Sequence, residues 1–97
     1  MIFSFHPDAE AELEGAIDYY ENIQPGLGCD LAIEVLAAIR RAVDLPKSWP
    51  VISGEIRRCL VTRFPYGILY SEEPNGIFII AVMHLHRQPG YWKHRKL

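Results

Sequence analysis

The sequence predicts an α+β two-layer sandwich in the order β-α-α-β-β-β, with an N-terminal helical hairpin packed on a twisted, mainly antiparallel sheet. In the first half of the chain, apolar residues recur every three or four positions, as they do in amphipathic helices. From Glu55 onward, short runs rich in β-branched and aromatic residues are separated by turn residues, which is typical of strands. The 97 residues, 49% of them hydrophobic, suffice for a single domain spanning residues 1–97 with its own core.

The opening elements are a short strand and a helix. "MIFSF" alternates apolar and small residues and predicts a strand that ends before His6. Pro7 suits the first turn of a helix, and Asp8 and Glu10 suit the positive end of its dipole. Through "DAEAELEGAIDYYENI" the predicted core stripe consists of Ala9, Leu13, Ala16, Ile17 and Tyr20. Acids at the same spacing line another face, namely Glu10, Glu14, Asp18 and Glu21.

A second helix follows the break "QPGLG". Its apolar stripe is formed by Leu31, Val35, Leu36, Ile39, Ala42 and Val43. Pro46 and Pro50 end this helix, because proline lacks an N–H and its ring clashes with helical backbone. We expect the following segment, "KSWPVISGEI", to be a loop of about ten residues. The two helices therefore form a hairpin whose apolar stripes cover one face of the sheet.

Three antiparallel strands are predicted in the second half, in "IRRCLVTRF", "YGILYS" and "GIFIIAVMHLH". The turn "EEPNG" joins the last two of them. Both faces of the last strand are apolar as far as Met83, so we expect this strand inside the sheet rather than at its edge. Simple alternation of side chains along it predicts one face that holds Phe78, Ile80, Val82, His84 and His86.

The two halves of the chain carry opposite charge. Residues 1–53 hold nine acids and three bases, a net charge of −6, whereas residues 54–97 hold three acids and seven bases, a net charge of +4. Such a distribution steers a polyanion or an acidic protein segment toward the second half. The sequence lacks signal-peptide features and any apolar run long enough to span a membrane, so we expect a cytoplasmic protein. There, Cys29 and Cys59 are expected to be reduced and buried.

The scattered bases of the second half are expected to meet on one side of the sheet, because they lie on neighbouring strands or at strand ends. This predicted basic set, a binding site for nucleic-acid backbone or an acidic peptide, comprises Arg57, Arg58, Arg63, His84, His86 and Arg87. The alternative is that individual arginines pair with the acidic helix face. In the closing "PGYWKHR", Trp92 is expected to pack on the core and Tyr91 to be exposed as a further binding residue.

Motifs for chemistry beyond binding are scarce. His84 and His86 have a spacing that zinc can use, but no further ligand with a clear spacing completes a site. The chain has no phosphate-binding glycine loop, no GxSxG elbow and no dinucleotide fingerprint. We therefore predict neither a metal nor a cofactor.

Nearly the whole chain resembles the RelE/ParE superfamily of bacterial toxins, the toxin halves of type II toxin–antitoxin systems, also known as plasmid stabilisation proteins. The resemblance is carried by "FHPDAEAELEGAIDYYE", by "GLG" between the helices, and by "RRCLVTRFPYGILY" followed by "AVMHLHRQPGYWKHR". It implies the same β-α-α-β-β-β fold. It also implies an acidic antitoxin that covers the basic half and assembles with the toxin into an oligomer.

Members of this superfamily act in two ways: ParE-like toxins inhibit DNA gyrase, and RelE-like toxins cleave mRNA in the ribosomal A site. A ribonuclease of this kind would move protons and stabilise the phosphate with Arg58, Arg63, His84, Arg87 and Tyr91. Gly67 stands where RelE-like enzymes carry an arginine, and "AVMHLHR" is closer to ParE-like members, so the resemblance favours a gyrase-inhibiting toxin. A ribosome-dependent mRNA endonuclease is the first alternative, and a non-toxic binding module of the same fold is the second.

Overall fold

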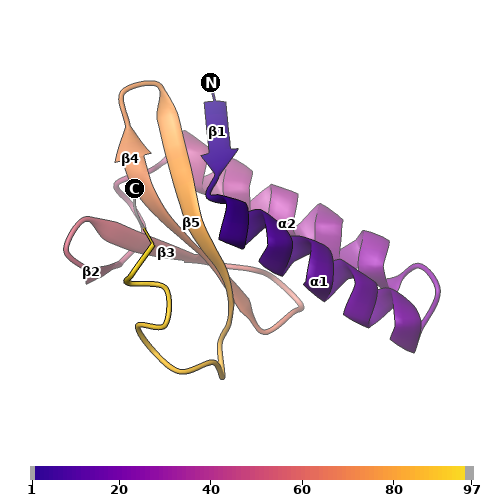
Figure 1. Cartoon of the computed structure of the whole chain (residues 1–97). Helices are drawn as coiled ribbons and strands as arrows, with labels where there is room; N and C mark the ends of the chain where they lie inside the picture. Colours follow the sequence, from indigo (N-terminus) through magenta and orange to yellow (C-terminus); the bar gives the residue numbers. More distant parts are fainter. Residues whose placement is uncertain (1, 96–97) are drawn as a thin grey trace.

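The computed structural model describes residues 2–95, in which two helices cover one face of a five-stranded sheet (Figure 1). The elements are β1 (Ile2–Phe5), α1 (Pro7–Ile23), α2 (Leu27–Asp44), β2 (Val51–Ser53), β3 (Ile56–Leu60), β4 (Tyr66–Glu73) and β5 (Gly76–His84). The strand order is β1-β5-β4-β3-β2, with β1 parallel to β5 and the other neighbouring pairs antiparallel. The predicted α+β class and the predicted place of β5 inside the sheet are therefore confirmed.

Local interactions fix the start of both helices. Nδ1 of His6 accepts a hydrogen bond of 3.0 Å from the Asp8 N–H and caps α1. The carboxylate of Glu21 accepts hydrogen bonds from the N–H groups of Gly26 and Gly28, at 2.9 and 3.0 Å, and so caps the N-terminus of α2. Because Glu21 belongs to α1, this cap also ties the two helices together at their turn. No helix among residues 2–95 is long and apolar enough to cross a membrane.

The main core lies between the helices and the sheet. Its largest fully buried side chains are Tyr70, Leu31, Ile39, Ile68, Ile77, Ile79, Val35 and Cys59. Burial of one large aliphatic or aromatic side chain contributes about 1.5–3 kcal/mol. Tyr70 donates its hydroxyl to the Pro46 carbonyl at 2.7 Å, and burial raises the pKa of Tyr70 to about 12. The predicted helix stripes supply this core, except that Leu36 is 40% exposed.

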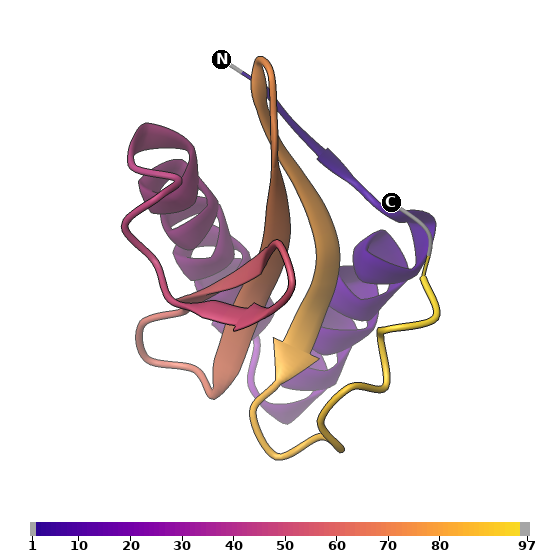
Figure 2. The same ribbon diagram turned by 90° about the vertical axis from the view of Figure 1, so that its left-hand side faces the viewer.

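The opposite face of the sheet carries a smaller apolar cluster. The sheet contributes to it Ile56, Leu69, Ile80, Ala81 and Met83. Trp92 covers these side chains and is 5% exposed, so the prediction that it packs is confirmed. Trp92 belongs to the C-terminal segment 85–95, which runs from the end of β5 back beside α1 (Figure 2).

The strands differ from the prediction at three places. The predicted loop 47–56 contains β2, a three-residue strand that pairs with β3. β3 ends at Leu60, and the chain then turns through Arg63, whose φ is 73°. β5 ends at His84 rather than at His86. A strand as short as β2 is stable only when it pairs with a neighbouring strand. The local sequence does not show that β3 lies beside it.

A bulge in β5 overturns the predicted alternation of its side chains. Ile79 and Ala81 pair with consecutive residues of β4, so Ile80 between them has no partner. Ile79 belongs to the helix-side core before the bulge, and Val82 belongs to it after the bulge. Val82 and His84 therefore lie on the face opposite to Ile80, whereas strict alternation predicted one shared face.

Both cysteines are free thiols. Cys59 is buried as expected, and burial raises the pKa of its thiol. Cys29 lies in the first turn of α2 and is exposed, so the prediction that it is buried is wrong. The core stripe of α2 passes through Leu31 and Val35, and Cys29 lies on another side of the helix.

Two glycine-to-alanine substitutions should change stability in opposite directions. A Cβ at Gly76 would lie 1.7 Å from the carbonyl oxygen of Ile2, so Gly76→Ala should push β1 from β5 and lower the free energy of unfolding by about 1–3 kcal/mol. A Cβ at Gly15 would meet nothing within 4 Å, and Gly15→Ala should stabilise α1 by about 1 kcal/mol. Urea unfolding measures both changes, and a stable Gly76→Ala variant would contradict the close approach of β1.

Candidate functional site

The predicted basic set does not gather on one side of the sheet. Nη1 of Arg57 donates to the carbonyl oxygens of Lys47, at 3.1 Å, and Trp49, at 2.7 Å, and thereby holds the loop between α2 and β2. Arg63 lies in the turn between β3 and β4, and its guanidinium is 3.6 Å from the carboxylate of Asp30 on α2. The predicted convergence is therefore wrong for these two arginines, because loop carbonyls and an acid of the helix hairpin engage them.

The two histidines lie together beside the helix-side core. The ring of His84 packs edge-on against Tyr66 and His86, with ring centroids 5.1 and 5.3 Å away. Nδ1 of His84 accepts a hydrogen bond of 3.1 Å from the His86 N–H, which links the two residues. Within residues 2–95, no three histidine, cysteine, aspartate or glutamate side chains are grouped closely enough to hold a metal ion.

A groove between the sheet and the C-terminal segment brings Arg58 and Arg87 together. Its volume is about 220 Å³. The residues that line it are Ile52, Ser53, Arg58, Met83, Leu85, Arg87, Pro89, Gly90, Trp92 and Lys93. Lys93 adds a third cation, which the sequence-based set did not include. Three cations among apolar side chains suit an extended, negatively charged segment.

Gly67 allows Arg58 to lie flat on the sheet. A Cβ at Gly67 would be 3.0 Å from Cδ of Arg58 and 3.5 Å from Cδ2 of Leu85, so a larger residue would displace the arginine stem. In the described part of the chain, no carboxylate lies within ion-pair distance of Arg58 or Lys93. The charges of these two side chains are therefore available to a ligand.

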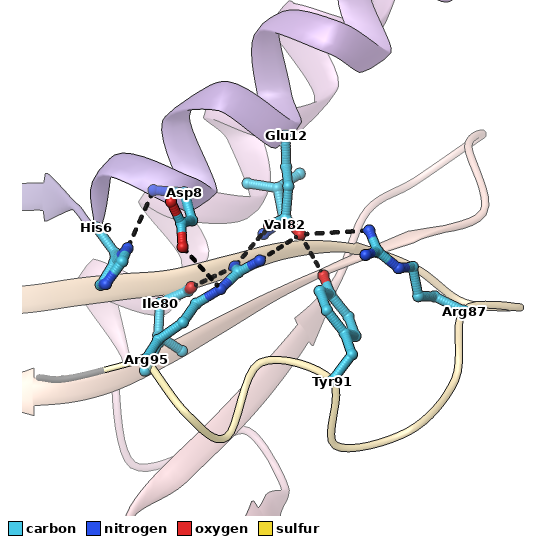
Figure 3. A network of polar contacts seen from close by, with 8 residues as sticks. All are labelled: His6, Asp8, Glu12, Ile80, Val82, Arg87, Tyr91 and Arg95. Carbon is cyan, nitrogen blue, oxygen red and sulfur yellow. Dashed lines mark hydrogen bonds and ion pairs between the residues drawn. The ribbon is translucent and has the colours of Figure 1, made fainter.

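The C-terminal segment is fixed to α1 by the carboxylate of Glu12 (Figure 3). Nη1 and Nη2 of Arg95 donate hydrogen bonds to Oε1 and Oε2 of Glu12, both at 2.9 Å, and form a bidentate ion pair. The hydroxyl of Tyr91 donates to Oε2 at 2.5 Å. The side chains of Glu12 and Arg95 are only 14% and 6% exposed. This Glu12 clasp, formed by Glu12, Tyr91 and Arg95, is thus a nearly buried anchor for the segment.

The clasp also supplies two hydrogen-bond partners to the outer edge of β5. β1 pairs with β5 only as far as Ile79, so β1 provides no partner for the backbone beyond it. Glu12 accepts a hydrogen bond from the Val82 N–H at 3.0 Å, and Arg95 donates to the Ile80 carbonyl at 2.9 Å. An open strand edge is a template for pairing with another chain, and these two side chains close it.

Acidic and basic side chains alternate in space from Asp8 through Arg95 and Glu12 to Arg87, which lies at the groove. The carboxylate of Asp8 lies 3.7 Å from Nε of Arg95, and Nη1 of Arg87 lies 3.7 Å from Oε2 of Glu12. The guanidinium of Arg87 stacks on the ring of Tyr91, 3.9 Å from the ring centroid. Arg87 is thus the member of this series that lines the groove.

Burial and hydrogen bonds shift the pKa values in the clasp. Burial alone would raise the pKa of Glu12, but hydrogen bonds from Arg95, Tyr91 and the Val82 N–H outweigh it and lower the pKa from 4.5. Burial and the hydrogen bond to Glu12 raise the pKa of Tyr91. Tyr91 is therefore a half-buried, neutral donor, and the prediction that it is exposed is wrong.

Sequence reasoning missed Glu12 and Arg95 altogether. The helical spacing could have indicated Glu12. This residue lies three positions after Ala9 and four before Ala16, and both alanines are buried. A carboxylate at that spacing lies at the border of the core stripe, where it needs a buried partner. No local pattern marks Arg95 as that partner, because the two residues are 83 positions apart.

Comparison with known proteins gives a match at the level of structure. No protein-family model and no curated protein matches this chain. Its structure is similar to a chain of the solved structure described as "Chromosomal ParDE TA system from P. aeruginosa", with a TM-score of 0.76 and 16% sequence identity over 89% of this chain and 97% of that chain. The two chains share one fold. The fold expected from the resemblance to RelE/ParE toxins is therefore confirmed.

Replacing Glu12 by glutamine should remove part of the pH dependence of stability. Because the pKa of Glu12 is lowered from 4.5 by folding, its carboxylate stabilises the fold above pH 4.5 and loses this contribution as the pH falls through the folded-state pKa. Near neutral pH, Glu12→Gln leaves the charge of Arg95 buried without its partner and should lower the free energy of unfolding by about 3 kcal/mol.

This stability difference between wild type and Glu12→Gln should shrink below pH 4.5, where the wild-type carboxylate becomes protonated. Urea unfolding at a series of pH values measures it. Glu14→Gln, at an exposed position of α1, is the matched control. A difference that stays constant down to the acid limit of folding would contradict the role of the Glu12 charge.

Proposed function

We propose that this chain is the toxin of a type II toxin–antitoxin pair and that it acts by binding its target. The observation that carries the proposal is the fold shared with a chain of a ParDE TA system over most of both chains. The sequence resemblance to RelE/ParE toxins, which runs from "FHPDAEAELEGAIDYYE" to "AVMHLHRQPGYWKHR", supports the same assignment. One fold serves many functions, so the support for a mode of action comes from the groove.

The placement of the catalytic candidates supports binding rather than RNA cleavage. A ribonuclease needs acid–base groups and cations around a single phosphate. Arg58 and Arg87 line the groove. Arg63, His84 and Tyr91 do not. The hydroxyl of Tyr91 donates to a carboxylate and its pKa is raised, which makes it a poor general base.

DNA gyrase is the proposed target, because the ending "AVMHLHR" and the glycine at position 67 favour the ParE-like branch of the superfamily. The proposed contact surface is the groove with its three cations, Arg58, Arg87 and Lys93. An acidic antitoxin segment would mask the same surface, since its carboxylates complement these charges. On this proposal the protein acts in the cytoplasm, where gyrase works.

Expression of the chain without an antitoxin should arrest bacterial growth, and the purified protein should block supercoiling by DNA gyrase. Arg58→Gln and Arg87→Gln should each raise the half-inhibiting concentration about tenfold, because each removes charge-assisted hydrogen bonds to the target. Arg40→Gln is the matched control, since Arg40 is exposed on α2 and does not line the groove. Full supercoiling at a large excess of the protein would exclude gyrase as its target.

Pulse labelling after induction distinguishes the alternatives. A gyrase inhibitor should stop DNA synthesis first, whereas a ribosome-dependent endonuclease should stop protein synthesis first. Unchanged growth would favour the non-toxic binding module.

A further inference from the structure

We infer that Glu12 is a positioning residue for Arg87: by holding both the guanidinium of Arg87 and the aromatic ring beneath it, Glu12 sets the direction in which Arg87 meets an anionic partner in the groove. This inference rests on the proposed binding function. It assigns α1 a part in that function, although no residue of α1 lines the groove.

Two contacts hold Arg87, and both lead to Glu12. The first is direct, because Nη1 of Arg87 lies 3.7 Å from Oε2 of Glu12. The second is the ring of Tyr91, whose centroid is 3.9 Å from the guanidinium carbon. The hydroxyl of that tyrosine donates to the same Oε2. One carboxylate oxygen therefore orients the arginine and the surface on which it stacks (Figure 3).

The side chain of Arg87 needs these contacts to be ordered, because no regular secondary structure holds its backbone. It follows the last strand, in a part of the chain without helix or strand, and its side chain is 53% exposed. A long side chain that moves freely loses rotamer freedom when it binds, and this loss weakens the complex. A side chain that is already ordered binds without that loss.

Glu12 orients Arg87 without occupying its donors. Arg95 already takes both oxygens of Glu12 at 2.9 Å, whereas Arg87 stays at 3.7 Å, beyond hydrogen-bond distance. Within residues 2–95, the N–H groups of Arg87 are therefore left for a carboxylate or phosphate in the groove. The two arginines have different tasks: Arg95 anchors the segment, and Arg87 presents its charge.

The order of the Arg87 side chain is the first test. The heteronuclear NOE of its Nε–H group, measured by NMR, should be strongly positive in wild type and in Glu14→Gln, and should fall toward zero in Glu12→Gln. Glu14 is the matched control because it is an exposed glutamate of the same helix. An unchanged NOE in folded Glu12→Gln would overturn the inference.

Affinity for an anionic probe is the second test, with a hexaglutamate peptide in titration calorimetry. Compared with Glu14→Gln, which corrects for the lost negative charge, Glu12→Gln should bind the peptide about fivefold more weakly. Arg87→Gln should bind it about tenfold more weakly than wild type. In the double variant, Glu12→Gln should add no further loss, because Glu12 acts through Arg87. Additive losses would mean an independent structural effect and would overturn the inference.

Tyr91→Phe provides a second variant for both tests if Glu12→Gln does not fold. It removes the hydroxyl that reaches Glu12 and retains the ring under Arg87. The NOE should fall in part and peptide binding should weaken about twofold; unchanged values would overturn the inference. Neither readout involves gyrase, so a failed supercoiling assay would refute the proposed target and leave this test in force.

Discussion

The ion pair between Glu12 and Arg95 is the interaction on which the C-terminal segment and the groove beside it depend. It joins the first helix to the far end of the described chain, and both partners are nearly buried. Loss of either partner would leave the other charge nearly buried without its counterion, which is strongly destabilising. Without the pair, the segment 85–95 would rest chiefly on the packing of Trp92, and the groove would lose one wall.

The face of the sheet opposite the helices carries both an apolar cluster and the groove with its cations. Trp92 covers the apolar cluster on one part of it, and Arg58 lies across another part. Gly67 belongs to this division, because its missing side chain makes room for the stem of Arg58 from the neighbouring strand. Gly67 thus helps to position the guanidinium of Arg58, which gives a structural reason for glycine at position 67.

Patterns that depend on near neighbours in the chain were predicted well. The helices and the packing of Trp92 followed from periodicity and residue type. The alternation along β5 failed at Ile80, because a bulge depends on how two strands align rather than on either strand alone. Glu12 escaped notice for a similar reason, since its partner Arg95 is 83 positions away.

The sequence by itself determined the α+β class, the order of helices and main strands, and the opposite charges of the two halves, because these follow from local periodicity and composition. Only the tertiary structure decided which bases line the groove. Arg57 and Arg63 are engaged by loop carbonyls and by Asp30, whereas Arg58 and Arg87 line one groove. That choice depends on long-range packing, which brings β2, β3, β5 and the C-terminal segment to the same place.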